Sequence, residues 1–269
     1  KMAWDKKKKK FSTIAIMEYG KFVLFGDSIT QFSCTQYGFH PALQNVYIRK
    51  LDVINRGFSG YNSEHARQIL PKILESETNI KLMTIFFGTN DAYDYINEIQ
   101  TVELDRYKDN LSVMVQMVLD KNIKPIIIGP GLHDPKMAKA MLAERGRPID
   151  KDPTTNQRLL KYSETAKKVA AQHNVAFIDT WNTLRQHQGW TKDQLFEVSA
   201  TKDKWEIGES LAEIVSDGIH FTAKSYKILF EEIIRVIEEK YPELAPENLP
   251  SQLCDWKQIN PNDLSSIFN

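Results

Sequence analysis

Four short polar motifs in this chain contain the residue types that acyl transfer uses. They are Gly-Asp-Ser at residues 26–28, Ser-Gly at 59–60, Gly-Thr-Asn-Asp at 88–91 and Asp-Gly-Ile-His at 217–220. A serine hydroxyl can act as the nucleophile, a histidine as its base, a carboxylate as the group that orients the histidine, and amides as donors to an oxyanion. Each motif alone is also typical of a turn or a helix cap, so the prediction depends on their convergence in space.

Apolar runs place these motifs at one edge of a predicted parallel sheet. Each run contains mostly Val, Ile, Leu and Phe with little alternation, which is typical of strands buried on both faces. Polar motifs follow the first three runs, and ligand sites in open α/β sheets form beyond the carboxyl ends of the strands. The five expected strands are residues 21–25, 52–55, 82–87, 125–128 and 175–178.

Segments with helical periodicity alternate with these runs, which indicates βαβ units and helices on both faces of the sheet. A threonine pair suited to capping precedes the third helical segment, and Thr222 is the expected N-cap of the last one. The four expected helices are residues 62–76, 103–121, 156–173 and 223–241.

Three segments do not fit this alternation, namely residues 1–16, 132–153 and 243–269. Residues 132–153 are polar and contain several prolines, so we expect a loop insertion after the fourth strand. Residues 1–16 include five consecutive lysines and are expected to be a tag or a dispensable extension. We therefore predict one hydrolase domain over residues 17–242, followed by a C-terminal extension over residues 243–269 that packs on it.

Together, the four motifs resemble the sequence blocks of the SGNH, or GDSL-type, serine hydrolases. The four residues that give this family its name fall on Ser28, Gly60, Asn90 and His220. The resemblance implies a three-layer α/β/α sandwich with a five-stranded parallel sheet of the flavodoxin type. It also implies that Ser28, Asp217 and His220 are the catalytic residues.

The expected mechanism follows from the chemistry of these groups. A serine hydroxyl is a poor nucleophile at neutral pH and needs a base within hydrogen-bond reach. We expect His220 to take the Ser28 proton as the serine attacks an ester carbonyl, and later to give it to the leaving alcohol. Asp217 would hold the imidazole in one tautomer and stabilise the imidazolium. The expected oxyanion donors are the amides of Ser28 and Gly60 and the Asn90 side chain, each worth about 3 kcal/mol.

Over residues 17 to about 257 the chain is similar to a narrower group of this family that hydrolyses small acetates. The similarity implies a carboxylester hydrolase of short-chain alcohol acetates such as isoamyl acetate. The same residues would serve a thioesterase, a lysophospholipase or a sugar O-deacetylase, and these alternatives stay open. Three residues in or next to the motifs are predicted to contact the substrate, namely Asp27, Phe58 and Tyr93.

The carboxylates Asp27 and Asp91 raise a rival interpretation, in which they form a metal site with Asp217 and His220. Only one histidine lies in this group, and the paired Asp-x-His and Gly-Asn-His motifs of metallophosphoesterases are absent from the sequence. We therefore disfavour a metal-dependent phosphoesterase, expect no metal or cofactor, and assign Asp27 and Asp91 to hydrogen bonding with loop amides. A non-catalytic binding protein is also disfavoured, because every catalytic position holds a competent residue.

Charge and cysteine content limit which partners and which cellular compartment are expected. The 269 residues carry 35 basic and 35 acidic side chains, which gives no reason to expect a nucleic-acid partner. No apolar run approaches the ~18 residues of a membrane span. The two cysteines, Cys34 and Cys254, fit a reducing compartment better than a disulfide scaffold. We expect a cytoplasmic protein that acts on a small-molecule ester, with a homodimer left open.

Overall fold

Five parallel strands form the centre of the fold, and each lies where an apolar run predicted it. They are β1 (Gly20–Gly26), β2 (Leu51–Gly57), β3 (Ile80–Phe86), β4 (Lys124–Ile128) and β5 (Ala176–Ile178). All neighbouring strands pair in parallel, in the order β2-β1-β3-β4-β5. The predicted five-stranded parallel sheet is therefore confirmed.

The molecule is described here by a computed structural model. The expected extension over residues 1–16 lies outside the residues that it describes, as do residues 147–151 of the expected insertion. The described residues are 18–94, 99–146, 152–202, 204–207 and 210–268.

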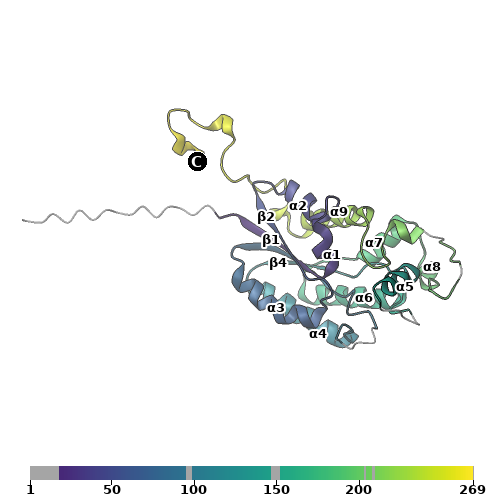
Figure 1. Ribbon diagram of the computed structural model, residues 1–269. Helices are drawn as coiled ribbons and strands as arrows, with labels where there is room; N and C mark the ends of the chain where they lie inside the picture. Colours follow the sequence, from purple (N-terminus) through teal and green to yellow (C-terminus); the bar gives the residue numbers. More distant parts are fainter. Residues whose placement is uncertain (1–17, 95–98, 147–151, 203, 208–209, 269) are drawn as a thin grey trace, which may run out of the picture.

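Helices cover both faces of the sheet, which completes the predicted three layers (Figure 1). On one face lie α3 (Ser63–Ser76), α4 (Leu104–Leu119) and α6 (Asn156–His173), packed against each other in that order. On the other face α2 (Phe39–Val46) packs beside α9 (Ala223–Lys240). The α/β/α sandwich implied by the resemblance is therefore confirmed.

The strand order creates a crevice at the carboxyl ends of β1 and β3. After β1 the chain adds β2 on one side, then crosses back to add β3 on the other side. Connections leave β1 and β3 in opposite directions at such a switch point, and ligands bind in the gap between them. The short helix α1 (Ser28–Gln31) begins directly beyond β1, so Ser28 lies at this switch point.

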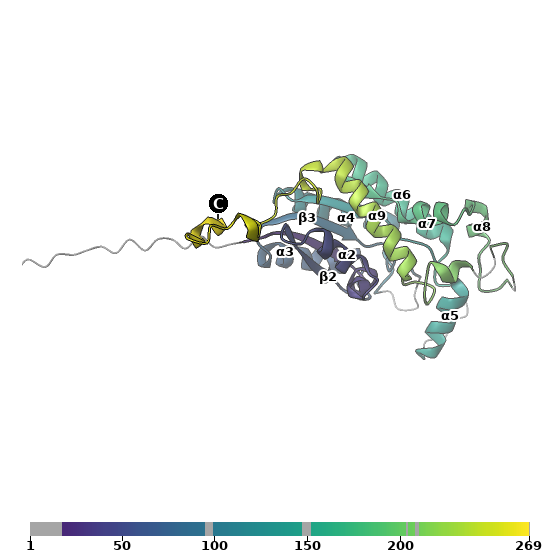
Figure 2. The same cartoon turned by 90° about the horizontal axis from the view of Figure 1, so that it is seen from above.

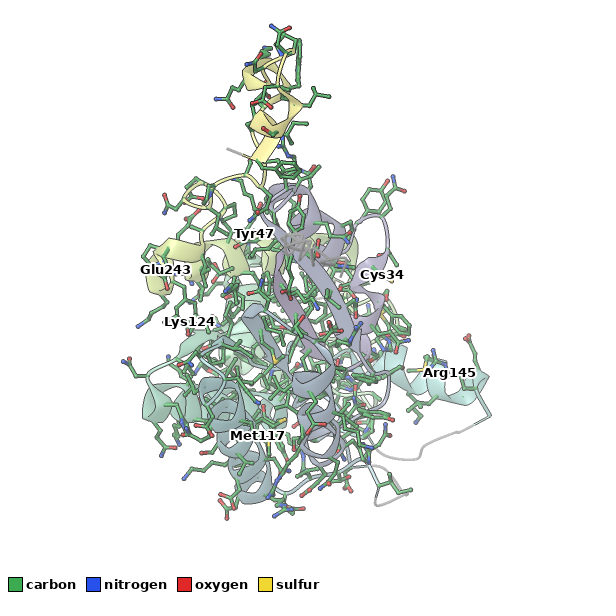
Figure 3. All side chains as sticks on the ribbon, turned by 90° about the vertical axis from the view of Figure 1, so that its left-hand side faces the viewer. Cys34, Tyr47, Met117, Lys124, Arg145 and Glu243 are labelled. Carbon is green, nitrogen blue, oxygen red and sulfur yellow. The ribbon has the colours of Figure 1, made fainter. Side chains whose placement is uncertain are left out.

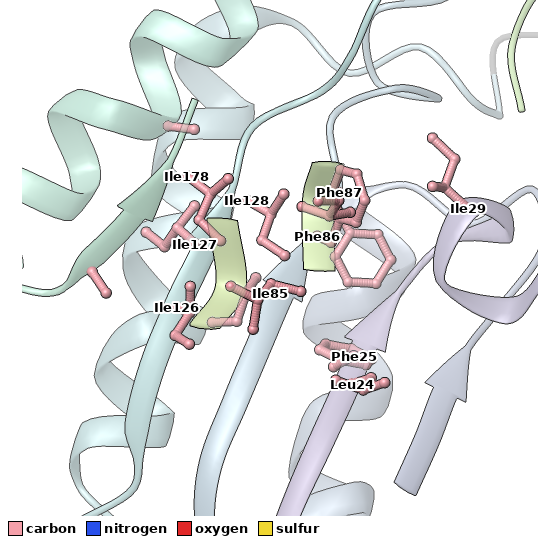
Figure 4. Close-up of a cluster of buried hydrophobic side chains, with 14 of the residues drawn as sticks. Leu24, Phe25, Ile29, Ile85, Phe86, Phe87, Ile126, Ile127, Ile128 and Ile178 are labelled. Carbon is pink, nitrogen blue, oxygen red and sulfur yellow. The ribbon is translucent and has the colours of Figure 1, made fainter. Parts of the chain in front are cut away.

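Aliphatic and aromatic side chains of the strands form the core. Figure 4 shows Ile126, Ile127 and Ile128 of β4 close to Ile178 of β5 and Ile85 of β3. All five side chains are buried, and full burial of one such side chain is worth about 1.5–3 kcal/mol. This buried sheet is the rigid support on which the polar loops at its carboxyl edge are built.

Side-chain caps set the starts of the long helices. The predicted first residue of α3, Asn62, is instead its N-cap: its side chain accepts from the His65 amide at 3.0 Å. Thr155 caps α6 by accepting from the Arg158 amide at 3.1 Å, and Thr222 caps α9. The capping roles predicted for the threonine pair and for Thr222 are confirmed.

The expectation of a loop over residues 132–153 is wrong for part of that segment, because α5 (Pro135–Glu144) occupies it. The Asp134 side chain accepts from the amides of Lys136 and Met137 at 2.9 and 3.0 Å, and a proline at the first helical position needs no partner for a missing N–H. Figure 2 shows α5 projecting from the body, and Figure 3 shows Arg145, just beyond its end, far out from the sheet.

Shorter helices complete the described chain and were not predicted from the sequence. Two are α-helical and follow β5, and the others are short 3₁₀ helices, three of them in the C-terminal segment. They are α7 (Thr180–His187), α8 (Lys192–Phe196), η1 (Phe32–Cys34), η2 (Ser210–Glu213), η3 (Pro242–Leu244), η4 (Trp256–Gln258) and η5 (Leu264–Phe268). No helix in the described part of the chain is long and apolar enough to span a membrane.

The C-terminal segment is joined to the body near its beginning. The Tyr47 hydroxyl donates to the Leu244 carbonyl at 2.9 Å, and the Arg49 guanidinium donates to the carbonyls of Gln252 and Leu253 at 2.8 and 2.9 Å. Beyond these contacts the chain extends away from the sheet (Figure 1). Trp256 in this outer part is 74% exposed. The division into a domain over residues 17–242 and a packed extension stays a prediction.

Tyr241 provides a test of how α9 is fastened to the sheet. Its buried hydroxyl donates to the Pro125 carbonyl of β4 at 2.8 Å and accepts from the Ala176 amide of β5 at 3.2 Å. Tyr241→Phe leaves both backbone groups without this partner, so we expect the free energy of unfolding to fall by about 1–3 kcal/mol. Chemical denaturation measures it, with Tyr37→Phe at an exposed position as the control. Equal stability of the two variants would contradict the assigned bridge.

Candidate active site

A line of hydrogen bonds joins the three residues predicted to be catalytic. The Ser28 Oγ lies 2.8 Å from His220 Nε2, and His220 Nδ1 lies 2.7 Å from Asp217 Oδ2. A neutral imidazole with its proton on Nδ1 donates to the carboxylate and presents the Nε2 lone pair to the serine hydroxyl. This is the geometry in which the histidine can take the serine proton.

Ser28 is held by the turn that leads out of β1. The Asp27 side chain caps α1 by accepting from the Ile29 amide at 2.9 Å. The Tyr226 hydroxyl of α9 donates to the Ile29 carbonyl at 2.9 Å, and the Asn55 side-chain amide donates to the Thr30 carbonyl at 2.8 Å. These contacts fix the backbone of α1 from both sides and leave the Ser28 side chain free to face His220.

The loop over residues 217–220 folds back on its own carboxylate. Asp217 Oδ1 accepts from the amides of Ile219 and His220 at 3.0 and 2.9 Å, while Oδ2 is hydrogen-bonded to Nδ1 of the His220 ring. Burial raises the pKa of Asp217, but the hydrogen bonds from the ring and from the two amides outweigh burial and hold that pKa well below its usual range. The carboxylate is therefore charged at neutral pH and can stabilise an imidazolium.

Gly218 lets this loop pack tightly against the start of α5. Its φ of +89° lies in the left-handed region, and a Cβ there would overlap the backbone of Asp134 and Ala138. The Gly218 carbonyl accepts from the Asp134 amide at 3.0 Å. The helix that replaces the expected loop thus supports the segment that carries Asp217 and His220.

His133 is a second support of this loop, and no partner spacing in the sequence allowed it to be recognised. It is buried, and its Nδ1 lies 2.9 Å from the Gly218 carbonyl and 2.8 Å from the Tyr93 hydroxyl. Burial lowers the pKa of His133 to about 4, so the ring is neutral at neutral pH. It links the loop after β3 to the loop over residues 217–220.

Two of the three predicted oxyanion donors, Gly60 and Asn90, lie on neighbouring loops. Gly60 has a φ of +80°, which favours glycine at this turn. The Asn90 side-chain amide donates to the Tyr61 carbonyl at 2.9 Å, which uses one of its two N–H groups. Beneath them Asp91 accepts from the Ser63 amide at 3.0 Å and from the Ser63 hydroxyl. The buried carboxylate thus ties the loop after β3 to the start of α3.

Asp27 and Asp91 bond loop amides, as the sequence predicted for their structural role. Both side chains are fully buried. Burial raises the pKa of each carboxyl to about 7, and the hydrogen bonds from the Ile29 amide to Asp27 and from Ser63 to Asp91 lower it less. Neither side chain therefore presents an exposed oxygen to a substrate.

Aromatic rings flank the reacting groups. Phe32 meets the His220 ring edge-on at a centroid distance of 5.2 Å and is 40% exposed. Phe58 stacks on Tyr61 at 5.3 Å, on the loop that contains Gly60. Tyr93, by contrast, is buried with its hydroxyl next to His133.

The structure therefore brings Ser28, Asp217 and His220 into contact, and substrate contact by Phe58, Tyr93 and Asp27 stays a prediction. For Tyr93 and Asp27 the burial favours a supporting position. Within the described residues, no cluster of three or more His, Cys, Asp or Glu side chains is arranged to hold a metal ion.

Comparisons with known proteins show which proteins the chain is similar to. The GDSL-like lipase/acylhydrolase family matches residues 24–228. The chain is 37% identical to the isoamyl acetate-hydrolyzing esterase of Saccharomyces cerevisiae, over 90% of this chain and 96% of that one. It is 29% identical to the Schizosaccharomyces pombe protein of the same name, over 90% and 84%. A lipase/acylhydrolase from Enterococcus faecalis superposes with a TM-score of 0.55 at 21% identity, over 87% and 100%.

The buried carboxyl of Asp27 leads to a prediction about stability and pH. Its pKa rises to about 7 on folding from an unfolded value near 3.9, so the native state binds the extra proton and stability falls as the pH rises from about 4 to 7. Asp27→Asn keeps an oxygen that can accept from the Ile29 amide but removes the buried charge. We expect this variant to lose that part of the pH dependence. The difference in free energy of unfolding between the variant and the unsubstituted protein should therefore shift in favour of the variant by on the order of 3 kcal/mol from pH 4 to pH 8.

Denaturation of both proteins at several pH values measures this difference. Asp52→Asn, at an exposed position of β2, is the control and should follow the unsubstituted protein. Parallel stability curves for the unsubstituted protein and Asp27→Asn would show that Asp27 does not titrate on folding.

Proposed function

The chain belongs to the GDSL-like lipase/acylhydrolase family and is an esterase or acylhydrolase, and we propose that it is a serine carboxylester hydrolase that works through an acyl-enzyme intermediate. The observation that carries the proposal is the hydrogen-bonded line from Asp217 through His220 to Ser28. A serine hydroxyl in contact with an oriented imidazole is the arrangement that nucleophilic acyl transfer requires.

In the first half of the reaction, Ser28 Oγ attacks the ester carbonyl carbon while His220 Nε2 takes the hydroxyl proton. The carbonyl becomes a tetrahedral oxyanion, and the imidazolium is stabilised by the charged Asp217 carboxylate. Collapse of this intermediate breaks the bond to the alcohol oxygen, which receives the proton from His220. Water then attacks the acyl-serine by the same steps, so acid and free Ser28 are released.

Three groups are proposed to bind the oxyanion: the backbone amides of Ser28 and Gly60 and the second N–H of the Asn90 side chain. The first N–H of Asn90 is already bound to the Tyr61 carbonyl, which holds the side chain in place. Donors that are fixed before the reaction lower the barrier because they need no reorganisation as charge develops. The contact between Asp91 and Ser63 adds to this fixation by joining the two loops.

We propose small esters as substrates, with acetates of short alcohols such as isoamyl acetate as the first candidates. The names of the two fungal relatives support acetates. The stacked rings of Phe58 and Tyr61 would border the acyl group next to Gly60. The same chemistry would also cleave thioesters, lysophospholipids or sugar acetates, and a substrate panel separates these. A cytoplasmic location and a homodimer stay predictions.

Replacement of the nucleophile tests the mechanism. We expect Ser28→Ala to lower kcat/KM for p-nitrophenyl acetate by at least about 1,000-fold, because the variant lacks the hydroxyl that forms the proposed acyl intermediate. Circular dichroism and thermal unfolding would show that the fold survives. Ser33→Ala, at a buried serine outside the hydrogen-bonded line, serves as the matched control and should keep most of the activity. Undiminished hydrolysis by Ser28→Ala would contradict the proposed serine mechanism.

A panel of p-nitrophenyl esters tests the proposed acyl size. We expect rates to fall as the acyl chain lengthens from acetate through butyrate to octanoate, and Phe58→Ala to raise octanoate relative to acetate hydrolysis because it removes a bordering ring. Phe268→Ala, at an exposed position in the C-terminal segment, is the control. A flat or rising profile up to palmitate, or faster cleavage of acyl-thioesters, would overturn the small-ester assignment.

A further inference from the structure

We propose that Gln100 is a positioning residue of the oxyanion site, acting through Asn90 and Gly60; this inference rests on the proposed function. The Gln100 side-chain nitrogen donates to the Gly60 carbonyl at 2.9 Å and lies 3.5 Å from the Asn90 side-chain oxygen. One carboxamide thus touches the two loops that carry Gly60 and Asn90, two of the three expected oxyanion donors. Its two N–H groups can serve both acceptors at once.

The backbone around Gln100 is itself anchored to these loops. The Asn62 side-chain amide donates to the carbonyls of Ile99 and Gln100, both at 2.9 Å. The Val102 amide donates to the Asp91 carbonyl at 3.1 Å. The Gln100 side chain therefore extends from a backbone segment that is tied to the start of α3 and to the loop after β3.

The contact with Gln100 and the bond to the Tyr61 carbonyl together favour one orientation of the Asn90 side-chain amide. The oxygen and nitrogen of a carboxamide occupy nearly the same space, so only hydrogen bonds distinguish its two orientations. With Asn90 Oδ1 facing the Gln100 donor and Nδ2 facing the Tyr61 carbonyl, an N–H remains for the oxyanion. The opposite orientation would turn an oxygen toward the oxyanion and repel it.

The contact with Gly60 restrains the most adaptable residue of the site. A glycine at a φ of +80° has no side chain to limit its rotation, and a Cβ there would lie 3.4 Å from the Gln100 nitrogen. The bond to the Gly60 carbonyl holds the glycine in the conformation in which its own amide can reach the oxyanion. Because Gln100 acts on donors rather than on the ester, its loss should lower kcat much more than it changes KM.

Gln100→Met tests this role, because methionine keeps a similar length but has no N–H. We expect kcat for p-nitrophenyl acetate to fall on the order of 10-fold, the size typical of losing a group that orients a functional residue without contacting the substrate. KM should change by less than about 3-fold. Gln100→Glu should be worse, since it places a carboxylate against two oxygen acceptors. Gln172→Met, at an exposed position near the end of α6, is the control for the substitution itself.

A double-mutant cycle with Asn90 separates positioning from a general loss of structure. Asn90→Ala alone should lower kcat about 100-fold. If Gln100 works through Asn90, Gln100→Met should cost clearly less in the Asn90→Ala background than in the unsubstituted protein. Additive effects, an unchanged kcat for Gln100→Met, or an effect confined to KM would overturn the proposal. Full activity of Ser28→Ala would instead overturn the proposed function, so the two failures are distinguishable.

Discussion

The hydrogen bond between the Ser28 hydroxyl and the His220 ring joins segments 192 residues apart in the sequence. A contact of 2.8 Å over such a separation requires both segments to be held by rigid structure, because a loop free to move by an ångström would lose it. The sheet supplies one side, since Ser28 follows β1 directly. The other side is supplied by the start of α5 and by His133, which both hold the carbonyl of Gly218.

Buried polar groups beneath the site hold the other loops in place by hydrogen bonds. Asp27 caps the turn that contains Ser28, and Asp91 ties the loop of Asn90 to the start of α3. Burying carboxyls in this way costs free energy, as their raised pKa values indicate. Their contacts place hydrogen-bond acceptors where several backbone and side-chain donors need them. The fold therefore gives up some stability to keep the donors and the nucleophile in a fixed relation.

Much of this arrangement could be predicted from the sequence, for reasons that are local. Apolar runs such as residues 125–128 are unmistakable because a strand buried on both faces excludes polar side chains. Thr222 could be recognised as a cap because its role depends on the next few residues only. The helix α5 was missed, although Asp134 and Pro135 are a good start signal, because the polar, proline-rich surroundings favoured a loop. His133 and Gln100 could not be recognised at all, since their partners Gly218 and Gly60 are neighbours only in the folded chain.

Covalent labelling of the protein by a fluorophosphonate, with the modified residue identified by peptide mass spectrometry, tests whether Ser28 is activated by His220. This reagent needs an activated hydroxyl, so its rate of reaction reports on the Ser28–His220 contact without requiring the natural ester. We expect a single adduct, on Ser28, formed far more slowly in a folded His220→Ala variant. An adduct on another residue, or Ser28 labelling at the same rate without the imidazole, would contradict it.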